Sequence, residues 1–187
     1  MSDGRGVPAV FIDRDGTLNE PVGYVNHRSR FRLFPWSVDA IRLVQKEGYL
    51  AVVVTNQSGV GRGYFSLSLL EGIHAELNSC LSDAGLTIDG LYYCPHKPED
   101  SCLSRKPKPG MILQARDELD IDLERSWMVG DSLSDLQAGW AAGTHAALVR
   151  TGFGEGLVES QKKQWQRPPD LIGENLYHVL CNIFWGS

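Results

Sequence analysis

The strongest constraint on the fold is an alternation along the chain, in which short apolar runs rich in β-branched residues recur between amphipathic stretches. Runs this short are typical of strands buried on both faces. Strands joined through helices require right-handed crossovers, which predicts a mostly parallel sheet covered by helices on both sides. The predicted strands are Val7–Ile12, Leu50–Val54, Leu91–Tyr93, Trp127–Val129, Ala146–Val149 and Asp170–Ile172.

The stretches between these runs have helical periodicity. The apolar residues of Val38–Val44 share one helix face, and Gly48 would end that helix. Ser68 and Glu71 have the spacing of a capping box, which predicts a helix that begins there and ends near Gly85. Further helices are predicted at Met111–Leu119, Leu133–Ala142 and Leu176–Phe184.

Two long segments lack this periodicity. We expect Asn19–Leu33 to form a flap or hairpin beside the site, and Gly152–Pro169 to be a loop-like connector. A length of 187 residues matches one domain of ordinary size. We therefore expect residues 1–187 to form a single α/β domain with a doubly wound, Rossmann-like sheet.

The charge balance restricts the class of partner. The chain has 18 Lys and Arg residues against 23 Asp and Glu, a formal charge of −5, whereas binders of nucleic acid or anionic membranes need a basic surface. No apolar run could span a bilayer, and the start of the chain lacks a secretory signal, so we expect a cytoplasmic protein. Any anion-binding site must therefore build its positive charge locally.

Carboxylates follow two of the predicted strands. Asp13 and Asp15 are two residues apart after the first run, so in extended chain both face one side, and Asp131 follows a later run. Ligands of open α/β sheets bind beyond the carboxyl ends of the strands. Three carboxylates there would suit a hard cation, Mg²⁺ above all. The alternative is that each Asp only makes a turn, as in many Asp-Gly pairs, but that leaves the convergence of three unexplained.

At these positions the chain resembles the haloacid dehalogenase (HAD) superfamily of phosphotransferases. Asp13–Leu18 matches the motif DxDGT, and Thr55 matches the hydroxyl residue at the end of the second strand. Lys106 matches the third motif, and Gly130–Asp135 matches GDxxxD. The four motifs occur in the family's order and together cover about residues 7–150.

The resemblance implies a mechanism. Asp13 would be the nucleophile that forms an aspartyl-phosphate, and Asp15 would be the general acid and then the general base. Mg²⁺ would be bound by the side chains of Asp13 and Asp131 and by the backbone carbonyl of Asp15. Thr55 and Lys106 would bind the phosphoryl oxygens. Asp135 could orient these groups or only stabilise the first turn of its helix.

Within the superfamily the chain is similar to the D-glycero-D-manno-heptose 1,7-bisphosphate 7-phosphatases and their histidinol-phosphate phosphatase relatives. The specific matches are Thr55–Gly59 and Arg105–Met111. The resemblance implies that Arg105 recognises the distal part of the substrate. The other residues it implies for the pocket are Pro21, Val22, Gly23, Tyr24, Asn56, Gln57 and Ser58. The chain leaves no room for a large cap domain, so a sugar could reach the site.

The same subgroup binds a structural zinc through a C-x-H…C-x-C loop. Cys94, His96 and Cys102 match this pattern, but Ser104 stands at the fourth ligand position, where a hydroxyl is a poor substitute for a thiolate. Three alternatives remain: zinc completed by water or a neighbour such as Asp100, a metal-free loop, or oxidised cysteines.

These observations lead to one expected function. We expect a monomeric, Mg²⁺-dependent phosphatase that removes the 7-phosphate of the heptose bisphosphate, a phosphorylated sugar, in the supply of heptose for bacterial lipopolysaccharide. The alternatives are the same chemistry on histidinol phosphate or another small phosphomonoester, or a non-catalytic sugar-phosphate sensor. The full set of Asp13, Asp15, Thr55, Lys106 and Asp131 argues against a sensor, since binding alone requires neither a nucleophile nor an acid.

Overall fold

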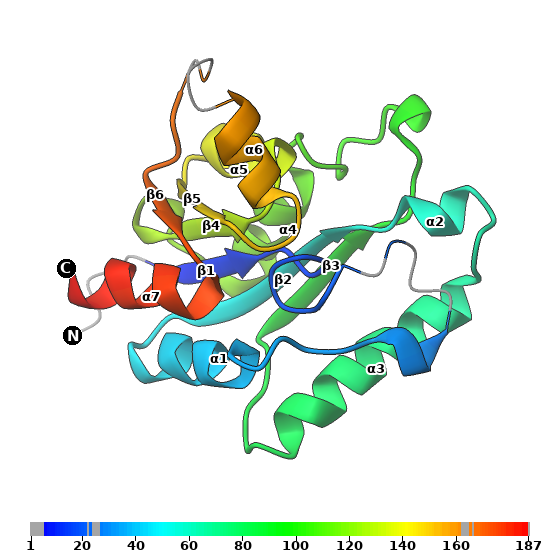
Figure 1. Ribbon diagram of the computed structural model, residues 1–187, viewed down its shortest axis with the longest axis horizontal. Helices are drawn as coiled ribbons and strands as arrows, with labels where there is room; N and C mark the ends of the chain where they lie inside the picture. The colour runs from blue at the N-terminus through cyan, green and yellow to red at the C-terminus, as the bar shows by residue number, and fades with distance from the viewer. Residues whose placement is uncertain (1–5, 22, 24–26, 162–164, 166, 187) are drawn as a thin grey trace.

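A six-stranded parallel sheet forms the centre of the computed structural model, which describes residues 6–21, 23, 27–161, 165 and 167–186 (Figure 1). The strand order is β3-β2-β1-β4-β5-β6, and each neighbouring pair in the described part of the chain is parallel. The strands are β1 (Ala9–Ile12), β2 (Leu50–Asn56), β3 (Gly90–Cys94), β4 (Trp127–Gly130), β5 (His145–Val149) and β6 (Leu171–Gly173).

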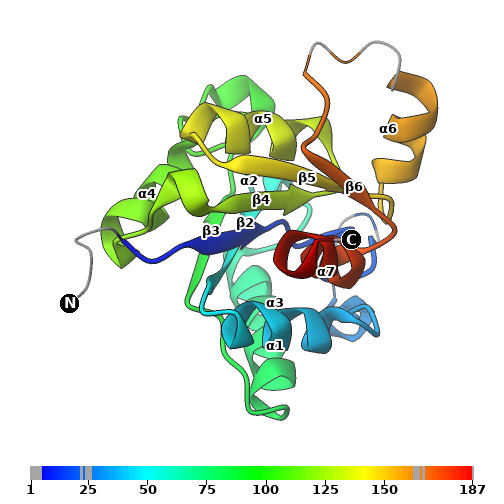
Figure 2. The same cartoon turned by 90° about the vertical axis from the view of Figure 1, so that its left-hand side faces the viewer.

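Helices cover both faces of the sheet, as Figure 2 shows. One face packs against α1 (Ser37–Lys46), α3 (Leu67–Ser82) and α7 (Leu176–Trp185). The other packs against α4 (Gly110–Leu119), α5 (Leu133–Ala142) and α6 (Gly154–Gln161). Side chains alternate along β1, so Val10 and Ile12 enter the first core while Ala9 and Phe11 enter the second. This two-sided burial explains why the strand sequences are continuous apolar runs.

The doubly wound parallel fold predicted from the sequence is confirmed, and each predicted strand lies within two or three residues of an observed one. Helix α1 ends before Gly48, which has φ +76°, as predicted. The capping prediction for α3 was wrong, because the N-cap is Ser66, whose Oγ accepts a hydrogen bond from the N–H of Leu69.

The expectation for the connector at Gly152–Pro169 needs correction. The predicted connector contains α6, which is short and polar but buries Val158 against the core beside α5. In the predicted flap, the described ends pair in antiparallel fashion: Asn19 bridges Leu33, and the N–H of Glu20 donates to the carbonyl of Arg32 over 3.0 Å. A 3-10 turn lies at Arg28–Arg30, and residues 22 and 24–26 are outside the described part of the chain. The remaining short elements are α2 (Ser58–Gly61) and 3-10 turns at Pro98–Asp100 and Leu123–Arg125.

The sheet order places a crevice at the end of β1. The chain passes from β1 through β2 to β3 on one side and from β4 through β5 to β6 on the other, so the connections diverge between β1 and β4. Ile12 of β1 is in register with Val129 of β4, and the N–H of Asp13 donates to the carbonyl of Val129 over 2.9 Å. Such a switch point is where ligands bind in open α/β sheets.

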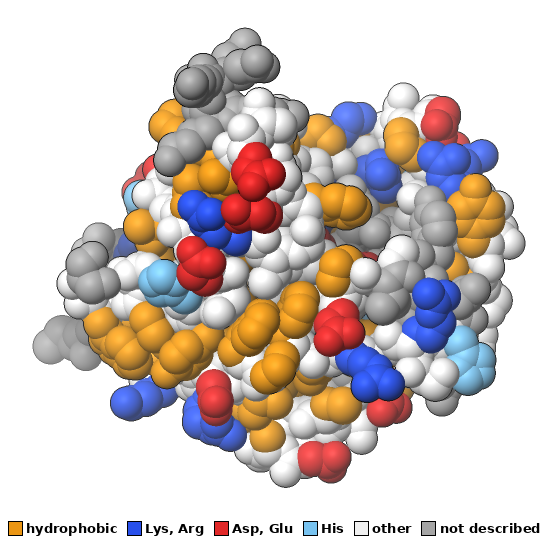
Figure 3. All heavy atoms as spheres, in the orientation of Figure 1, with side chains coloured by type: hydrophobic (Ala, Val, Ile, Leu, Met, Phe, Trp, Pro, Cys, Tyr) orange, Lys and Arg blue, Asp and Glu red, His pale blue; other side chains and the backbone are white. Residues whose placement is uncertain are grey.

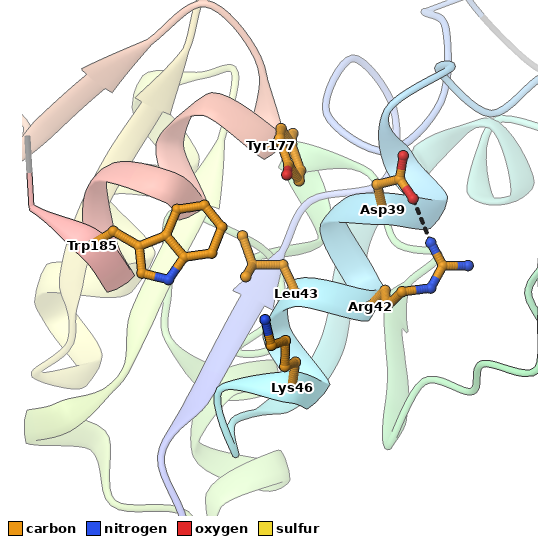
Figure 4. A pocket seen from close by; sticks show the side chains of 6 residues that line it. All are labelled: Asp39, Arg42, Leu43, Lys46, Tyr177 and Trp185. Atoms are coloured by element: carbon orange, nitrogen blue, oxygen red, sulfur yellow. Dashed lines mark hydrogen bonds and ion pairs between the residues drawn. The ribbon is translucent and has the colours of Figure 1, made fainter.

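A second hollow lies between α1 and α7, where hydrophobic side chains gather on the face shown in Figure 3. It has a volume of about 160 Å³ and is walled by Tyr177 and Trp185 of α7 and by Leu43 of α1 (Figure 4). Asp39 and Arg42 form an ion pair at its rim. It contains no nucleophile beside a base and lies apart from the switch point.

None of the helices in the described part of the chain has the length and apolarity that a membrane span needs.

Candidate active site

The pocket at the switch point has a volume of about 260 Å³ and is predominantly acidic. The end of β2, the loops that follow β1, β4 and β5, the first turn of α5 and the loop before α4 contribute to it. Its lining residues are Asp13, Asp15, Thr55, Asn56, Lys106, Asp131, Ser132, Ser134, Asp135 and Phe153. The five residues expected to act in catalysis and Mg²⁺ binding therefore meet in one cavity.

Asp13 and Lys106 form a buried ion pair at the bottom of this pocket. The Nζ of Lys106 lies 2.7 Å from Oδ1 of Asp13 and also donates to the carbonyl of Val54 over 2.9 Å. Burial raises the pKa of Asp13 from 3.8 to about 7, although the Lys106 charge opposes the rise. The pKa of Lys106 lies above its ordinary value because the charges of Asp13 and Asp135 outweigh its burial. Lys106 is thus held as a cation directly beside the Asp13 carboxylate.

Asp135 has both of the roles that the sequence left open. Its Oδ2 accepts hydrogen bonds from the N–H and Oγ of Ser132, which caps the N-terminus of α5. Its Oδ1 lies 2.6 Å from the Nζ of Lys106. The same carboxylate therefore begins a helix and fixes the position of the lysine.

Asp13, Asp131 and Asp135 offer carboxylate oxygens that all lie within 4.8 Å of one another. Burial and repulsion from Asp13 and Asp135 raise the pKa of Asp131 to about 8. A cluster of buried carboxylates that repel one another is stabilised by a cation, and oxygen ligands suit Mg²⁺. A Cβ at Gly16 or Gly152 would lie 2.1 or 1.9 Å from Oδ2 of Asp131, so glycines leave the space around this carboxylate. The residues present fit a hard divalent cation.

The carboxylate of Asp15 lies outside the cluster of three carboxylates and accepts hydrogen bonds from four donor atoms on three side chains. Its Oδ1 accepts from Nε and Nη2 of Arg14 and from Nδ2 of Asn19, at 2.9–3.2 Å. Its Oδ2 accepts from Nη2 of Arg14 and from Nε2 of Gln57, each over 2.8 Å. Although burial alone would raise it, the pKa of Asp15 is lowered by the Arg14 charge and these hydrogen bonds. Asp13 and Asp15 thus have pKa values shifted in opposite directions.

Residues that follow β2 serve the catalytic groups directly. Gln57 Nε2 donates to Oγ1 of Thr55 over 2.9 Å, which leaves the Thr55 hydroxyl able to donate into the pocket. The amide of Asn56 pairs with the backbone of Lys106 in both directions, at 3.0 and 3.1 Å. Asn56 and Gln57 were predicted to contact substrate, yet their polar atoms hold Lys106, Thr55 and Asp15.

The other predicted substrate residues are dispersed. Arg105 lines a neighbouring cavity of about 210 Å³, which shares Lys106 with the acidic pocket, and donates to the carbonyl of His96 over 3.1 Å. Pro21, Gly23 and Ser58 are not among the residues that line the acidic pocket. Val22 and Tyr24 lie outside the described residues.

Cys94, His96 and Cys102 converge beside β3, with ligand atoms that all lie within 4.8 Å of one another. Cys94 is buried, and its Sγ lies 3.6 Å from Nδ1 of His96. Hydrogen bonds from the backbone and hydroxyl of Ser104 lower the pKa of Cys102. Asp100, considered as a fourth ligand, instead accepts from the N–H of Lys97 over 2.8 Å. Three soft ligands are therefore grouped, and Ser104 donates to one of them.

Sequence reasoning missed three parts of this site. Arg14 was not singled out in the sequence, but it is 1% exposed and turned toward Asp15. Asn19 was placed in a flap, although its amide holds Asp15. Phe153 was assigned to a connector, yet its N–H donates to Asp131 over 2.9 Å and its side chain is 74% exposed at the pocket. Hydrophobic periodicity does not indicate such contacts, because they depend on the tertiary arrangement of the loops.

The chain is similar to several proteins of known function. A family model described as HAD-hydrolase-like matches residues 103–179. D-glycero-beta-D-manno-heptose-1,7-bisphosphate 7-phosphatase of Salmonella typhi is 46% identical over 156 residues, which cover 79% of this chain and 83% of that one. The enzyme of the same name from Pasteurella multocida is 45% identical over 163 residues, covering 83% and 88%.

Two solved structures have similar folds. The first is D,D-heptose 1,7-bisphosphate phosphatase from B. bronchiseptica, complexed with magnesium and phosphate. It has a TM-score of 0.86 and 34% identity, with coverage of 96% of this chain and 99% of that one. The enzyme from Burkholderia thailandensis has a TM-score of 0.72 and 28% identity, with coverage of 95% and 99%.

Proposed function

The chain belongs to the family of D-glycero-β-D-manno-heptose 1,7-bisphosphate 7-phosphatases within the HAD-like hydrolases, and on that premise we propose that it hydrolyses the 7-phosphate of this heptose bisphosphate. The observation that carries the proposal is the single pocket in which Asp13 faces Lys106, with Asp131 and Asp15 beside it. This arrangement combines a nucleophile, a cationic group and a second carboxylate for proton transfer. It supports phosphate ester hydrolysis through a covalent intermediate.

In the first step Asp13 attacks phosphorus. A bond forms between a carboxylate oxygen and phosphorus, and the bond from phosphorus to the sugar oxygen breaks. Lys106 bears a positive charge 2.7 Å from the nucleophile, so it reduces the repulsion between Asp13 and an anionic phosphate. The hydroxyl of Thr55 donates a hydrogen bond to a phosphoryl oxygen. The products are an aspartyl-phosphate and the sugar hydroxyl.

Asp15 transfers the proton in each step. It protonates the departing sugar oxygen, and its carboxylate then accepts a proton from the water that hydrolyses the aspartyl-phosphate. The lowered pKa of Asp15 favours its carboxylate form, which the second role requires. A bound phosphate adds negative charge beside Asp15 and raises its pKa, which favours the protonated form that the first role requires.

Mg²⁺ completes the site. Asp13 and Asp131 would bind it through their side chains and Asp15 through its backbone carbonyl. Asp135 would support the site through its ion pair with Lys106. When bound, the cation neutralises charge on the transferring phosphoryl group. The raised pKa values of Asp13 and Asp131 support this assignment, because a cation stabilises both carboxylates in the ionised form.

The direct test is phosphate release from a panel of phosphomonoesters, with Mg²⁺ and with a chelator. The panel contains the heptose 1,7-bisphosphate, its two monophosphates, histidinol phosphate and p-nitrophenyl phosphate. We expect Mg²⁺-dependent release from the 7-position, with the highest kcat/KM on the bisphosphate. A preference for histidinol phosphate would mean that histidinol phosphate, not the heptose bisphosphate, is the substrate. No turnover of any ester would favour a non-catalytic sensor.

The cysteine cluster supports a bound zinc. We propose that Cys94, His96 and Cys102 bind it, with water rather than Ser104 in the fourth position. Elemental analysis of the purified protein is expected to show about one zinc per chain, lost in the Cys102→Ser variant. A protein without zinc that keeps full activity after chelation and Mg²⁺ replenishment would contradict the proposal.

The cellular setting is part of the same proposal. We propose that residues 1–187 act as a monomeric single domain in the cytoplasm, where the product supplies heptose for lipopolysaccharide. A bisphosphorylated sugar is too polar to cross a bilayer unaided, so its phosphatase is expected where the sugar is made. Light scattering on a size-exclusion column tests the oligomeric state, and a dimer would contradict it.

A further inference from the structure

Arg14 is a fully buried cation in the loop that follows β1, with 1% of its surface exposed. Its Nε and Nη2 bind Asp15 in a fork, and its Nη1 points away from Asp15 to another side chain. A planar guanidinium held at one edge can still tilt about its bond to the carbon chain. The contact at Nη1 therefore adds a further restraint on its orientation.

That contact is the imidazole of His74, a residue of α3. Nε2 of His74 lies 3.2 Å from Nη1 of Arg14, and the two residues are 60 positions apart in the chain. His74 is 7% exposed. Its ring packs against that of Tyr93 on β3, with centroids 5.3 Å apart and planes at 53°. The sheet thus restrains the imidazole.

The chemistry of the pair requires a neutral histidine. Arg14 can only donate, so Nε2 of His74 must accept and the ring proton must reside on Nδ1. Burial, together with the Arg14 charge, lowers the pKa of His74 from 6.5 to about 4. At neutral pH the imidazole is therefore an uncharged acceptor for the buried cation.

We propose that His74 is a positioning residue for the reaction, one that aligns the Asp15 carboxylate by fixing the plane of Arg14. The contacts form a chain from α3 through Arg14 to both oxygens of Asp15. Asn19 and Gln57 still hold Asp15 when Arg14 tilts, so loss of His74 misaligns the carboxylate without freeing it. The inference rests on the proposed role of Asp15 as acid and base.

Leaving groups of different basicity separate positioning from a general structural role. A sugar alkoxide requires protonation by Asp15, whereas p-nitrophenolate leaves as a stable anion without it. The His74→Leu variant removes the acceptor at similar size. We expect its first-turnover rate on the heptose bisphosphate to fall about 10-fold with KM within about twofold of wild type. We expect its first-turnover release of p-nitrophenol to stay within about twofold.

Two further variants control this comparison. His74→Gln offers an amide oxygen near the place of Nε2, so it should restore the sugar rate to within about threefold of wild type. Leu77→Ala opens a cavity on the same helix, in the hydrophobic core. It should lower the melting temperature and leave the ratio of the two substrate rates unchanged.

The outcomes are distinct. An unchanged sugar rate in His74→Leu would overturn the inference, as would an equal loss on both substrates that glutamine does not rescue. A wild-type enzyme without Mg²⁺-dependent turnover would instead overturn the proposed function.

Discussion

Replacing Asp131 by asparagine should stabilise the metal-free protein while abolishing its response to Mg²⁺. Asp131 is 2% exposed and lies beside Asp13 and Asp135, so its charge is both desolvated and repelled. Its Oδ2 accepts a hydrogen bond from the N–H of Phe153, which the amide oxygen of asparagine can also accept. The substitution therefore removes the charge and can keep the contact.

The size of the effect follows from the pKa of Asp131, which rises from 3.8 to about 8 in the folded protein. A pKa raised by folding contributes stability that is fully present below pH 3.8 and is lost as pH rises through about 8. At about 1.4 kcal/mol per pH unit, the full loss is about 6 kcal/mol. The asparagine amide is itself a buried polar group, so we expect a net gain of about 2 kcal/mol at pH 8.

Urea unfolding in the presence of EDTA measures this difference. The gain of Asp131→Asn over wild type should be largest at pH 8 and shrink toward pH 5. Mg²⁺ at about 100 times its dissociation constant should then stabilise wild type by about 2.7 kcal/mol and leave the variant nearly unchanged. Asp117→Asn, an exposed carboxylate on α4, controls for the change in net charge.

Two results would refute this reasoning. A metal-free variant less stable than wild type at pH 8 would mean that Asp131 is not destabilised by burial and repulsion. Equal stabilisation of variant and wild type by Mg²⁺ would remove Asp131 from the metal site.

Three further predictions follow from the same geometry. Asp13→Asn should leave a folded protein whose phosphate release falls by at least about 10³-fold, because an amide is a poor nucleophile; residual turnover near wild type would exclude Asp13 as nucleophile. Gly152→Ala should cost about 1–2 kcal/mol in urea unfolding and weaken the melting-temperature shift with Mg²⁺, since φ is +60° and the Cβ would lie 1.9 Å from Oδ2 of Asp131; an unchanged shift would contradict it. The lowered pKa of His74 means that its contribution to stability, up to about 3 kcal/mol, is present above pH 6.5 and lost as pH falls toward about 4. The wild-type loss over that range should therefore exceed that of His74→Gln, and parallel curves would disprove it.

The main layout of the fold was predictable because it depends on patterns of neighbouring residues. Apolar runs long enough for a strand are buried on both faces, and the helical stretches between them must bury their own apolar faces. A parallel sheet covered by helices satisfies both requirements. Gly48 ended α1 as expected, since the signal for a helix end is local. Helix α6 was missed because its sequence is mostly polar, and its place is decided by the few apolar residues it packs beside α5.

The candidate site was predictable only in part. Asp13, Asp15 and Asp131 could be brought together from the sequence, because the carboxyl ends of parallel strands share one edge of the sheet. Lys106 was found by resemblance alone. Its actual partners, Asp13 and Asp135, depend on how its loop approaches the end of β1. Asn56 and Gln57 were expected at the pocket, but their hydrogen bonds to Lys106, Thr55 and Asp15 could not be predicted, because a motif does not specify which way a side chain points.

The sequence by itself determined the doubly wound sheet and the residues that gather beyond its strands, because hydrophobic periodicity and chain connectivity decide both. Only the tertiary structure decided the charge states and partners within the site. Arg14 and His74 are 60 positions apart, and no periodic pattern relates them. Their contact exists because α3 packs on one face of the sheet and passes beside the loop after β1. Burial there sets the pKa values, and burial is a property of the packed molecule.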